Sequence, residues 1–150
     1  MILSELQFEF PDATLDTWHQ HSFGGGWVQN TASVDDTAFV GPDAIVYDNA
    51  WVFGNAEISG DARICGKAMV YDNAVVSDNA EVSDNAMVSG GAVVSGNAWV
   101  SDNAEVYGNA RVSGKAWVFD TARVFGNAEI SGNAKVYSNT KVSGKAKVSK

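Results

Sequence analysis

The chain has 150 residues, enough for one domain with a sizeable core and too few for two ordinary domains. It is 45% apolar and 19% charged, unlike a disordered chain, and its formal net charge of -8 argues against direct binding of nucleic acid. One cysteine excludes an intramolecular disulfide framework, and no apolar run or basic leader predicts a membrane span or signal peptide, so we expect a cytoplasmic protein.

The beginning of the chain does not repeat. Leu6, Phe8 and Phe10 alternate with polar residues, which predicts a short strand that Pro11 ends. Three consecutive glycines follow at 24–26 and lead into the rest of the chain. No Lys-Ser or Lys-Thr pair follows them, so they do not form a phosphate-binding loop.

The rest of the chain has a period of six residues. From Ala32 to Ala146 every sixth residue is Ala except Thr140, and the residue two places later is always Val or Ile. The unit Ala-x-Val-x-(Gly/Asp)-Asn fits a short strand followed by a turn, because Ala and Val share one face and Gly and Asn tolerate left-handed backbone angles. Each hexad is therefore one side of a solenoid coil, and successive coils stack through parallel strands.

The hexads resemble those of left-handed parallel β-helix proteins. The segment Val40-Gly41-Pro42-Asp43-Ala44-Ile45 has that family's order of aliphatic residue, Gly, two turn residues, small residue and variable residue. The resemblance covers twenty hexads and implies an all-β triangular solenoid of nearly seven coils, with about 18 residues per coil. The left hand is implied by the resemblance alone. Most later hexads have Ser, Tyr or Phe where the family has Gly after the aliphatic residue.

A solenoid exposes an apolar end that another segment has to cover. We predict that residues 1–30 form an N-terminal cap, with Trp18, Phe23 or Trp27 over the core, and that residues 31–150 form the hexapeptide-repeat β-helix. The stretch Gly-Gly-Gly-Trp-Val-x-x-x-Ala also resembles the start of uncharacterised hexapeptide-repeat proteins of bacteria and their phages.

Outward residues one coil apart stack in columns, so their spacing assigns them to three faces. The first face carries Trp51, Phe53, Met69, Tyr71, Met87, Tyr107 and Phe125. The second carries Ile45, Tyr47, Cys65, Trp99, Trp117, Phe119 and Tyr137. The third repeats serine from Ser59 to Ser149. We expect Cys65 to point outward as a free thiol without a neighbouring base.

Large apolar surfaces rarely stay in water on a monomer. Two aromatic faces and one polar face suit a homotrimer in which each subunit gives two faces to its neighbours, and the family resemblance also implies trimers. The alternative is that aromatic side chains stack in ladders on one chain. We expect the ligand or oligomer surface to contain Trp51, Phe53, Met69, Tyr71, Trp99, Tyr107, Trp117, Phe119, Phe125 and Tyr137.

Charge is distributed unevenly along the chain. Residues 1–107 hold 16 acidic and 2 basic residues, whereas residues 108–150 hold 2 acidic and 8 basic residues. One interpretation is that the basic end discourages end-to-end growth of the sheets, and the other is that it docks on an acidic surface. The basic end consists of Lys141, Lys145, Lys147 and Lys150.

Many proteins of the resembled family are acyltransferases that use acetyl-CoA, and their chemistry needs a base, commonly His, near the acceptor. The hexads contain no histidine and no loop that breaks the repeat, so His19 and His21 in the cap are the only candidate bases. We therefore expect a non-catalytic scaffold or binding protein without a cofactor. An acyltransferase that uses acetyl-CoA and a cap histidine is the alternative.

The remaining sequence features concern metals and partners. The Asp-Asn turns lack the nonapeptide spacing of calcium-binding β-rolls, so we expect no metal. The partners that fit are other copies of the chain, a small ligand or peptide in grooves between subunits, or a protein on the acidic surface, such as a host factor of a phage.

Overall fold

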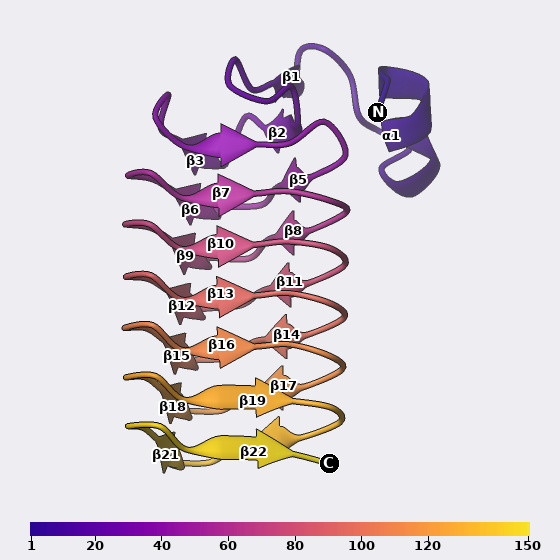
Figure 1. Cartoon of the computed structure of the whole chain (residues 1–150). Helices are drawn as coiled ribbons and strands as arrows, with labels where there is room; N and C mark the ends of the chain where they lie inside the picture. The colour runs from indigo at the N-terminus through magenta and orange to yellow at the C-terminus, as the bar shows by residue number, and fades with distance from the viewer.

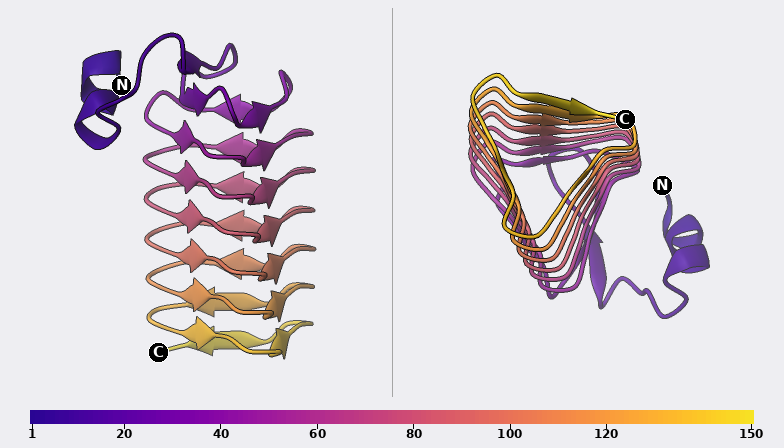
Figure 2. Two further views of the ribbon diagram at one scale, coloured as in Figure 1. Left: turned by 180° about the vertical axis from the view of Figure 1, so that it is seen from behind. Right: turned by 90° about the horizontal axis from the view of Figure 1, so that it is seen from below.

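The computed structural model describes all 150 residues as a prism of stacked coils, with a short helical segment beside one end (Figure 1). Helix α1 (Leu3–Glu9) is followed by 22 strands, most of them two residues long. The prism is triangular when viewed along its axis (Figure 2). The all-β parallel solenoid of nearly seven coils that the hexads predict is therefore confirmed.

Three sheets, which we name A, B and C, form the sides of the prism. Sheet A has the order β1 (Trp18–Gln20), β2 (Trp27–Gln29), β5 (Ile45–Val46), β8 (Arg63–Ile64), β11 (Glu81–Val82), β14 (Trp99–Val100), β17 (Trp117–Val118) and β20 (Lys135–Val136). Sheet B has the order β3 (Ser33–Val34), β6 (Trp51–Val52), β9 (Met69–Val70), β12 (Met87–Val88), β15 (Glu105–Val106), β18 (Arg123–Val124) and β21 (Lys141–Val142). Sheet C has the order β4 (Phe39–Val40), β7 (Glu57–Ile58), β10 (Val75–Val76), β13 (Val93–Val94), β16 (Arg111–Val112), β19 (Glu129–Ser131) and β22 (Lys147–Ser149).

All strand pairs are parallel except β1 with β2, and each residue lies beside the residue one coil further along the chain. Trp99 pairs with Trp117 in this way, and Val46 pairs with Ile64. In Figure 1 the front strands run from left to right, and the chain then passes behind them while it descends, so the coil is left-handed. This is the hand that the resemblance implies, against the general preference for right-handed crossovers.

The core is a column of small and β-branched side chains. The Ala and the Val or Ile of each hexad point inward, and those from Ala38 to Val136 are fully or almost fully buried. Only near the two ends does the column become exposed, partly at Ala32, Val34 and Val148 and more fully at Thr140 and Ala146. The interior is therefore filled by aliphatic side chains, and every larger side chain of the hexads lies outside.

A residue with left-handed backbone angles turns each corner of the prism. Between Asp48 and Gly144 this residue is always Gly or Asp, apart from Ser138. The following Asn is not left-handed, which corrects the expectation that Asn shares this role. Asp has a second use there, because its carboxylate accepts a hydrogen bond from the next coil: Asp78 Oδ2 lies 2.9 Å from the amide nitrogen of Gly96.

Residues 3–9 form a helix, so the strand predicted over Leu6, Phe8 and Phe10 is wrong. Leu6 is buried and Phe10, four residues later, packs against Trp18 with 4.8 Å between ring centroids, whereas Phe8 is 90% exposed. Leu6 and Phe10 are therefore inward-facing residues one helix turn apart, and the apparent alternation with Phe8 is not that of a strand. The amide of Ile2 donates a hydrogen bond to Glu5 Oε2 at 2.7 Å and holds the start of the helix.

Backbone and one histidine cover the upper edge of sheet C, at the N-terminal end of the core. Val40 donates its amide to Phe23 O at 3.0 Å and accepts a hydrogen bond from the amide of Gly26 at 2.9 Å. His21 is buried, and its Nε2 atom lies 2.8 Å from the carbonyl oxygen of Ala38. These contacts satisfy polar groups of strand β4 that have no strand above them.

The aromatic residues expected over the core lie elsewhere. Trp18 and Trp27 are buried on the outer side of sheet A, and Phe23 is half exposed with its ring edge-on to Phe39 at 5.1 Å. Gly24 and Gly26 allow the segment to lie directly on strand β4, because there is no room for a side chain at either position.

Gly24→Ala tests this close contact. An added Cβ would lie 2.2 Å from Val40 O at a φ of 113°, so we expect the free energy of unfolding to fall by about 2–4 kcal/mol in denaturant titrations. Gly25→Ala is the matched control, since Gly25 has a φ of 80° but no atom within 4 Å, and we expect a loss of about 1 kcal/mol. Equal losses for the two variants would contradict this role of the segment.

Candidate functional site

The N-terminal segment covers the upper half of the outer side of sheet A. Leu6, Ala13, Trp18, Trp27 and Ile45 form a second, smaller core there. The ring of Tyr47 closes its lower margin, 5.0 Å from that of Phe10. Ile45 and Tyr47, which the spacing assigns to an outward aromatic face, are thus covered by the chain's own helix and loop.

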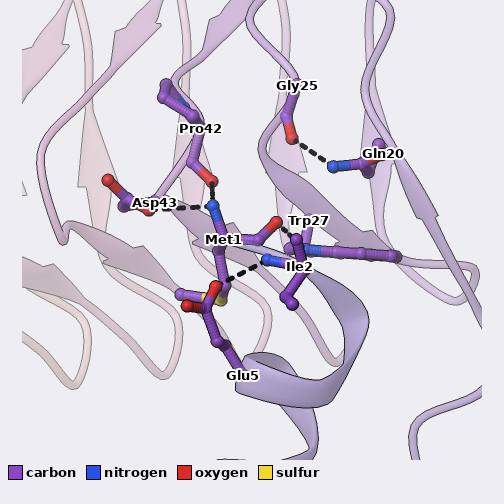
Figure 3. A network of polar contacts seen from close by, with 8 residues as sticks. All are labelled: Met1, Ile2, Glu5, Gln20, Gly25, Trp27, Pro42 and Asp43. Atoms are coloured by element: carbon purple, nitrogen blue, oxygen red, sulfur yellow. Dashed lines mark hydrogen bonds and ion pairs between the residues drawn. The ribbon is translucent and has the colours of Figure 1, made fainter.

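Polar contacts fasten this segment to the prism (Figure 3). The amino group of Met1 lies 3.0 Å from Asp43 Oδ1 and 3.2 Å from Pro42 O. The indole Nε1 of Trp27 donates to Met1 O at 3.0 Å. Further down, Arg63 forms an ion pair with Glu9 just beyond the hydrophobic contact. The upper part of sheet A therefore offers no aromatic surface to a partner.

Burial at the lower margin of this contact changes the acidity of two side chains. It raises the pKa of Tyr47, and the hydrogen bond with Cys65 raises it further. Burial also raises the pKa of the Cys65 thiol to about 11, although the bond with Tyr47 acts in the opposite direction. Cys65 occupies an outward column as expected, but it is buried, and its raised pKa favours the protonated thiol at neutral pH.

The next coil of sheet A carries a partly buried carboxylate, that of Glu81. Burial is the main cause that raises the pKa of Glu81, and the nearby Arg63 opposes the change. Glu81 lies at the boundary between the covered upper half of sheet A and its open lower half.

The lower half of sheet A carries an open aromatic ladder, which we name ladder A and which consists of Trp99, Trp117, Phe119 and Tyr137. The two indoles stack with 4.9 Å between centroids and 4° between planes, and Phe119 stacks on Tyr137 at 5.4 Å. Trp99 and Tyr137 are 40% and 51% exposed. Lys135 Nζ lies 5.6 Å from the ring of Trp117 as a cation–π contact.

Two buried serines orient the indoles of ladder A. Trp99 Nε1 donates to Ser83 Oγ at 2.9 Å, and Trp117 Nε1 donates to Ser101 Oγ at the same distance. The sequence predicts no role for these serines. A signal was present, because each is a small polar residue in a column that carries Tyr47, Phe119 and Tyr137, and each precedes its tryptophan by 16 residues.

Sheet B carries a second ladder, ladder B, formed by Phe53, Tyr71, Tyr107 and Phe125. Phe53 and Tyr71 stack with 4.7 Å between centroids and 1° between planes, and Tyr107 and Phe125 stack with 5.0 Å and 2°. Trp51 packs beside Phe53 and is 49% exposed. The structure therefore places all expected surface residues on sheets A and B, where the rings form ladders within one chain and are still partly exposed.

Ladder B is interrupted once. The column that runs through Tyr71 and Tyr107 has Ser89 between them, and a cavity of about 200 Å³ opens at this point. Met87 and Glu105 line it together with Ser89 and the two tyrosines. The Glu105 carboxylate also contacts Arg123, with 3.4 Å between Oε2 and Nε.

The candidate histidines are separated from these surfaces. His21 is buried and occupied by the Ala38 carbonyl group, and His19 Nδ1 lies 2.7 Å from Asn30 Oδ1. Neither histidine lines any of the four cavities of the structure. No group of three or more His, Cys, Asp or Glu side chains is placed to hold a metal ion.

The lysines of the basic end lie at the last coils. Each sheet finishes with a strand that begins with lysine, namely Lys135 in sheet A, Lys141 in sheet B and Lys147 in sheet C. Lys147 Nζ is 3.9 Å from Glu129 Oε2, and the other two make no ion pair. Lys145 and Lys150 are exposed beside these strand edges.

The fold and its hexads define a parallel β-solenoid, and one comparison with known families agrees. A family described as YdcK Beta solenoid repeat matches residues 62–78, 80–96 and 104–120, and each match spans three strands, or nearly one coil. Together they cover about a third of the chain. Searches of curated proteins and of solved structures found no match. The chain is thus a β-solenoid repeat protein.

The only helix of the structure is far too short to cross a lipid bilayer. It contains seven residues, and no helix has the length and hydropathy of a membrane span.

Thiol labelling tests whether the N-terminal segment stays docked. With its raised pKa and its burial, native Cys65 should react with a maleimide at pH 7.5 at least about 100-fold more slowly than in guanidinium chloride. Ser77→Cys in a Cys65→Ser background is the control, because Ser77 holds the equivalent hexad position on the uncovered sheet C. Native labelling of Cys65 as fast as that of Ser77→Cys would contradict the covered surface.

Proposed function

We propose that the protein is a non-catalytic, trimeric β-solenoid scaffold that binds a ligand or partner along its aromatic surfaces. The observation that carries this proposal is the contrast between the sides of the prism. Sheets A and B display partly exposed aromatic ladders, whereas sheet C displays a serine column with charged residues. Exposed apolar surface that is confined to defined faces is typical of protein or ligand contacts.

The covered half of sheet A limits how subunits can meet. In the proposed trimer, ladder A is the contact on one side of each subunit and sheet B is the contact on the other. The N-terminal segment stands beside the upper coils of sheet A, so it lies at the margin of that contact and sets its upper limit. Grooves between subunits would then be lined by residues of both ladders.

The acyltransferase alternative has less support from the geometry. A general base has to reach the acceptor through a free ring nitrogen. The Nε2 atom of His21 is buried and engaged with a backbone carbonyl group, so this side chain acts in capping the core. His19 is exposed but borders no cavity.

Two further parts of the proposal rest on the residues alone. The relation to hexapeptide-repeat proteins of bacteria and phages stays a prediction from the Gly-Gly-Gly-Trp stretch and the hexads. A cytoplasmic location, and a protein partner such as a host factor on the acidic upper coils, are proposed on the same basis.

Light scattering combined with size exclusion tests the assembly. We expect three times the chain mass of 15.9 kDa for the wild type, and a shift to one chain mass for Trp99→Lys, because the charge would be buried in the contact of ladder A. Val93→Lys is the matched control, since Val93 holds the equivalent strand position on sheet C. A wild type with a mass of 15.9 kDa at micromolar concentration would overturn the trimer.

A further inference from the structure

We propose that the break in ladder B is a binding slot for one planar aromatic molecule that carries a hydrogen-bond donor on its edge. The slot consists of Tyr71 above, Tyr107 below and Ser89 between them in the same column, with Met87 and Glu105 of the neighbouring column along one side. It deepens the proposed binding function by naming a site and a ligand class. All five residues belong to one chain, so the slot is complete in a monomer, and in the proposed trimer it faces the groove that residues of both ladders line.

The geometry of the ladder supports a ring in this place. In the intact parts of ladder B, rings follow each other at 4.7 and 5.0 Å with planes within 2° of parallel. Ser89 removes one ring from this series, so Tyr71 and Tyr107 each have one ring face without an aromatic neighbour. One planar group inserted between them would stack on both tyrosines at the spacing that the ladder already has.

The size of the slot limits the ligand. A cavity of about 150 Å³ is enough for benzene, and this cavity has about 200 Å³. It therefore has room for a ring system of one or two fused rings.

The residues along the side of the slot specify the edge of the ligand. The Glu105 carboxylate makes one ion pair, with 3.4 Å between Oε2 and Nε of Arg123. A donor on the ring edge, such as an N–H group or an attached ammonium group, can bind there. Met87 provides a thioether contact to the rim of the ring, and the Ser89 hydroxyl can donate or accept at the back.

Other rings of the prism do not provide such a site. In ladder A, Trp117 stacks on Trp99 and has Lys135 over its ring, so neither of its faces is free for a ligand. The break at Ser89 is where two free ring faces in one column oppose each other with a cavity between them.

Calorimetric titration with tryptamine tests the slot. We expect tryptamine to bind with one site per chain at a Kd of about 1 mM or lower. 2-Cyclohexylethylamine has the same ammonium group without a planar ring and should bind at least tenfold more weakly. Indole-3-acetate keeps the ring but reverses the charge and should bind at least about threefold more weakly than tryptamine because of Glu105.

Ser89→Tyr fills the slot with the missing ring and should weaken tryptamine binding at least tenfold. It should also raise Tm, because the completed ladder gains two stacked pairs. Ser95→Tyr is the matched control on sheet C, where the neighbouring column residues are serines, and it should leave binding unchanged. Glu105→Gln should remove the preference for tryptamine over indole-3-acetate.

Three results would overturn the slot: no heat with tryptamine at about 5 mM, equal binding of the cyclohexyl amine, or unchanged binding by a folded Ser89→Tyr variant. Light scattering on the same samples separates this outcome from failure of the trimer. If the protein is a monomer and binds tryptamine in a Ser89-dependent way, the slot stands and only the trimer is overturned. If it is a trimer that does not bind tryptamine, the slot is overturned and the trimer stands.

Discussion

The whole prism depends on the backbone hydrogen bonds that hold successive coils in one constant register. The amide of Phe39 donates to Ala56 O and that of Trp51 to Ala68 O, each at 2.9 Å, and the same step recurs down all three sheets. A slip of one residue within a strand would turn its inward Val to the outside, because side chains alternate along a strand. The hexads run from residue 31 to residue 150 without an insertion, so every coil keeps the register of its neighbours.

The same register turns positions in the sequence into columns of identical spacing. Each column repeats its chemistry at about 4.8 Å, which is close to the stacking distance of aromatic rings and within reach of a carboxylate. Rings in one column therefore become parallel, as Phe53 and Tyr71 do within 1°, and corner carboxylates reach the amides of the following coil. A ring inside such a ladder shows its edge to solvent, so recognition through a ring face is confined to the ends and breaks of a ladder.

The prism could be predicted from the sequence because the hexads repeat. Prediction failed where the repeat is absent or where a residue's role depends on neighbouring coils. A period of six residues assigns Trp99 and Tyr71 to their faces without any knowledge of packing, and the structure places them there. The N-terminal segment has no period, so Leu6 and Phe10 suggested a strand although tertiary contacts with Trp18 favour a helix. The roles of Ser83 and Ser89 depend on neighbouring coils, because a serine orients an indole in one column and leaves a cavity in another.

Identical coils offer a partner no reason to bind at one height rather than another. Specific recognition on this prism therefore has to come from departures from the repeat. The N-terminal segment covers the upper part of sheet A, and Ser89 interrupts ladder B at a single coil. Lysines replace aromatic and acidic residues in the last strands. The repeated residues supply the rigid frame, and these few exceptions give it direction along its axis and one position on sheet B where two free ring faces oppose each other.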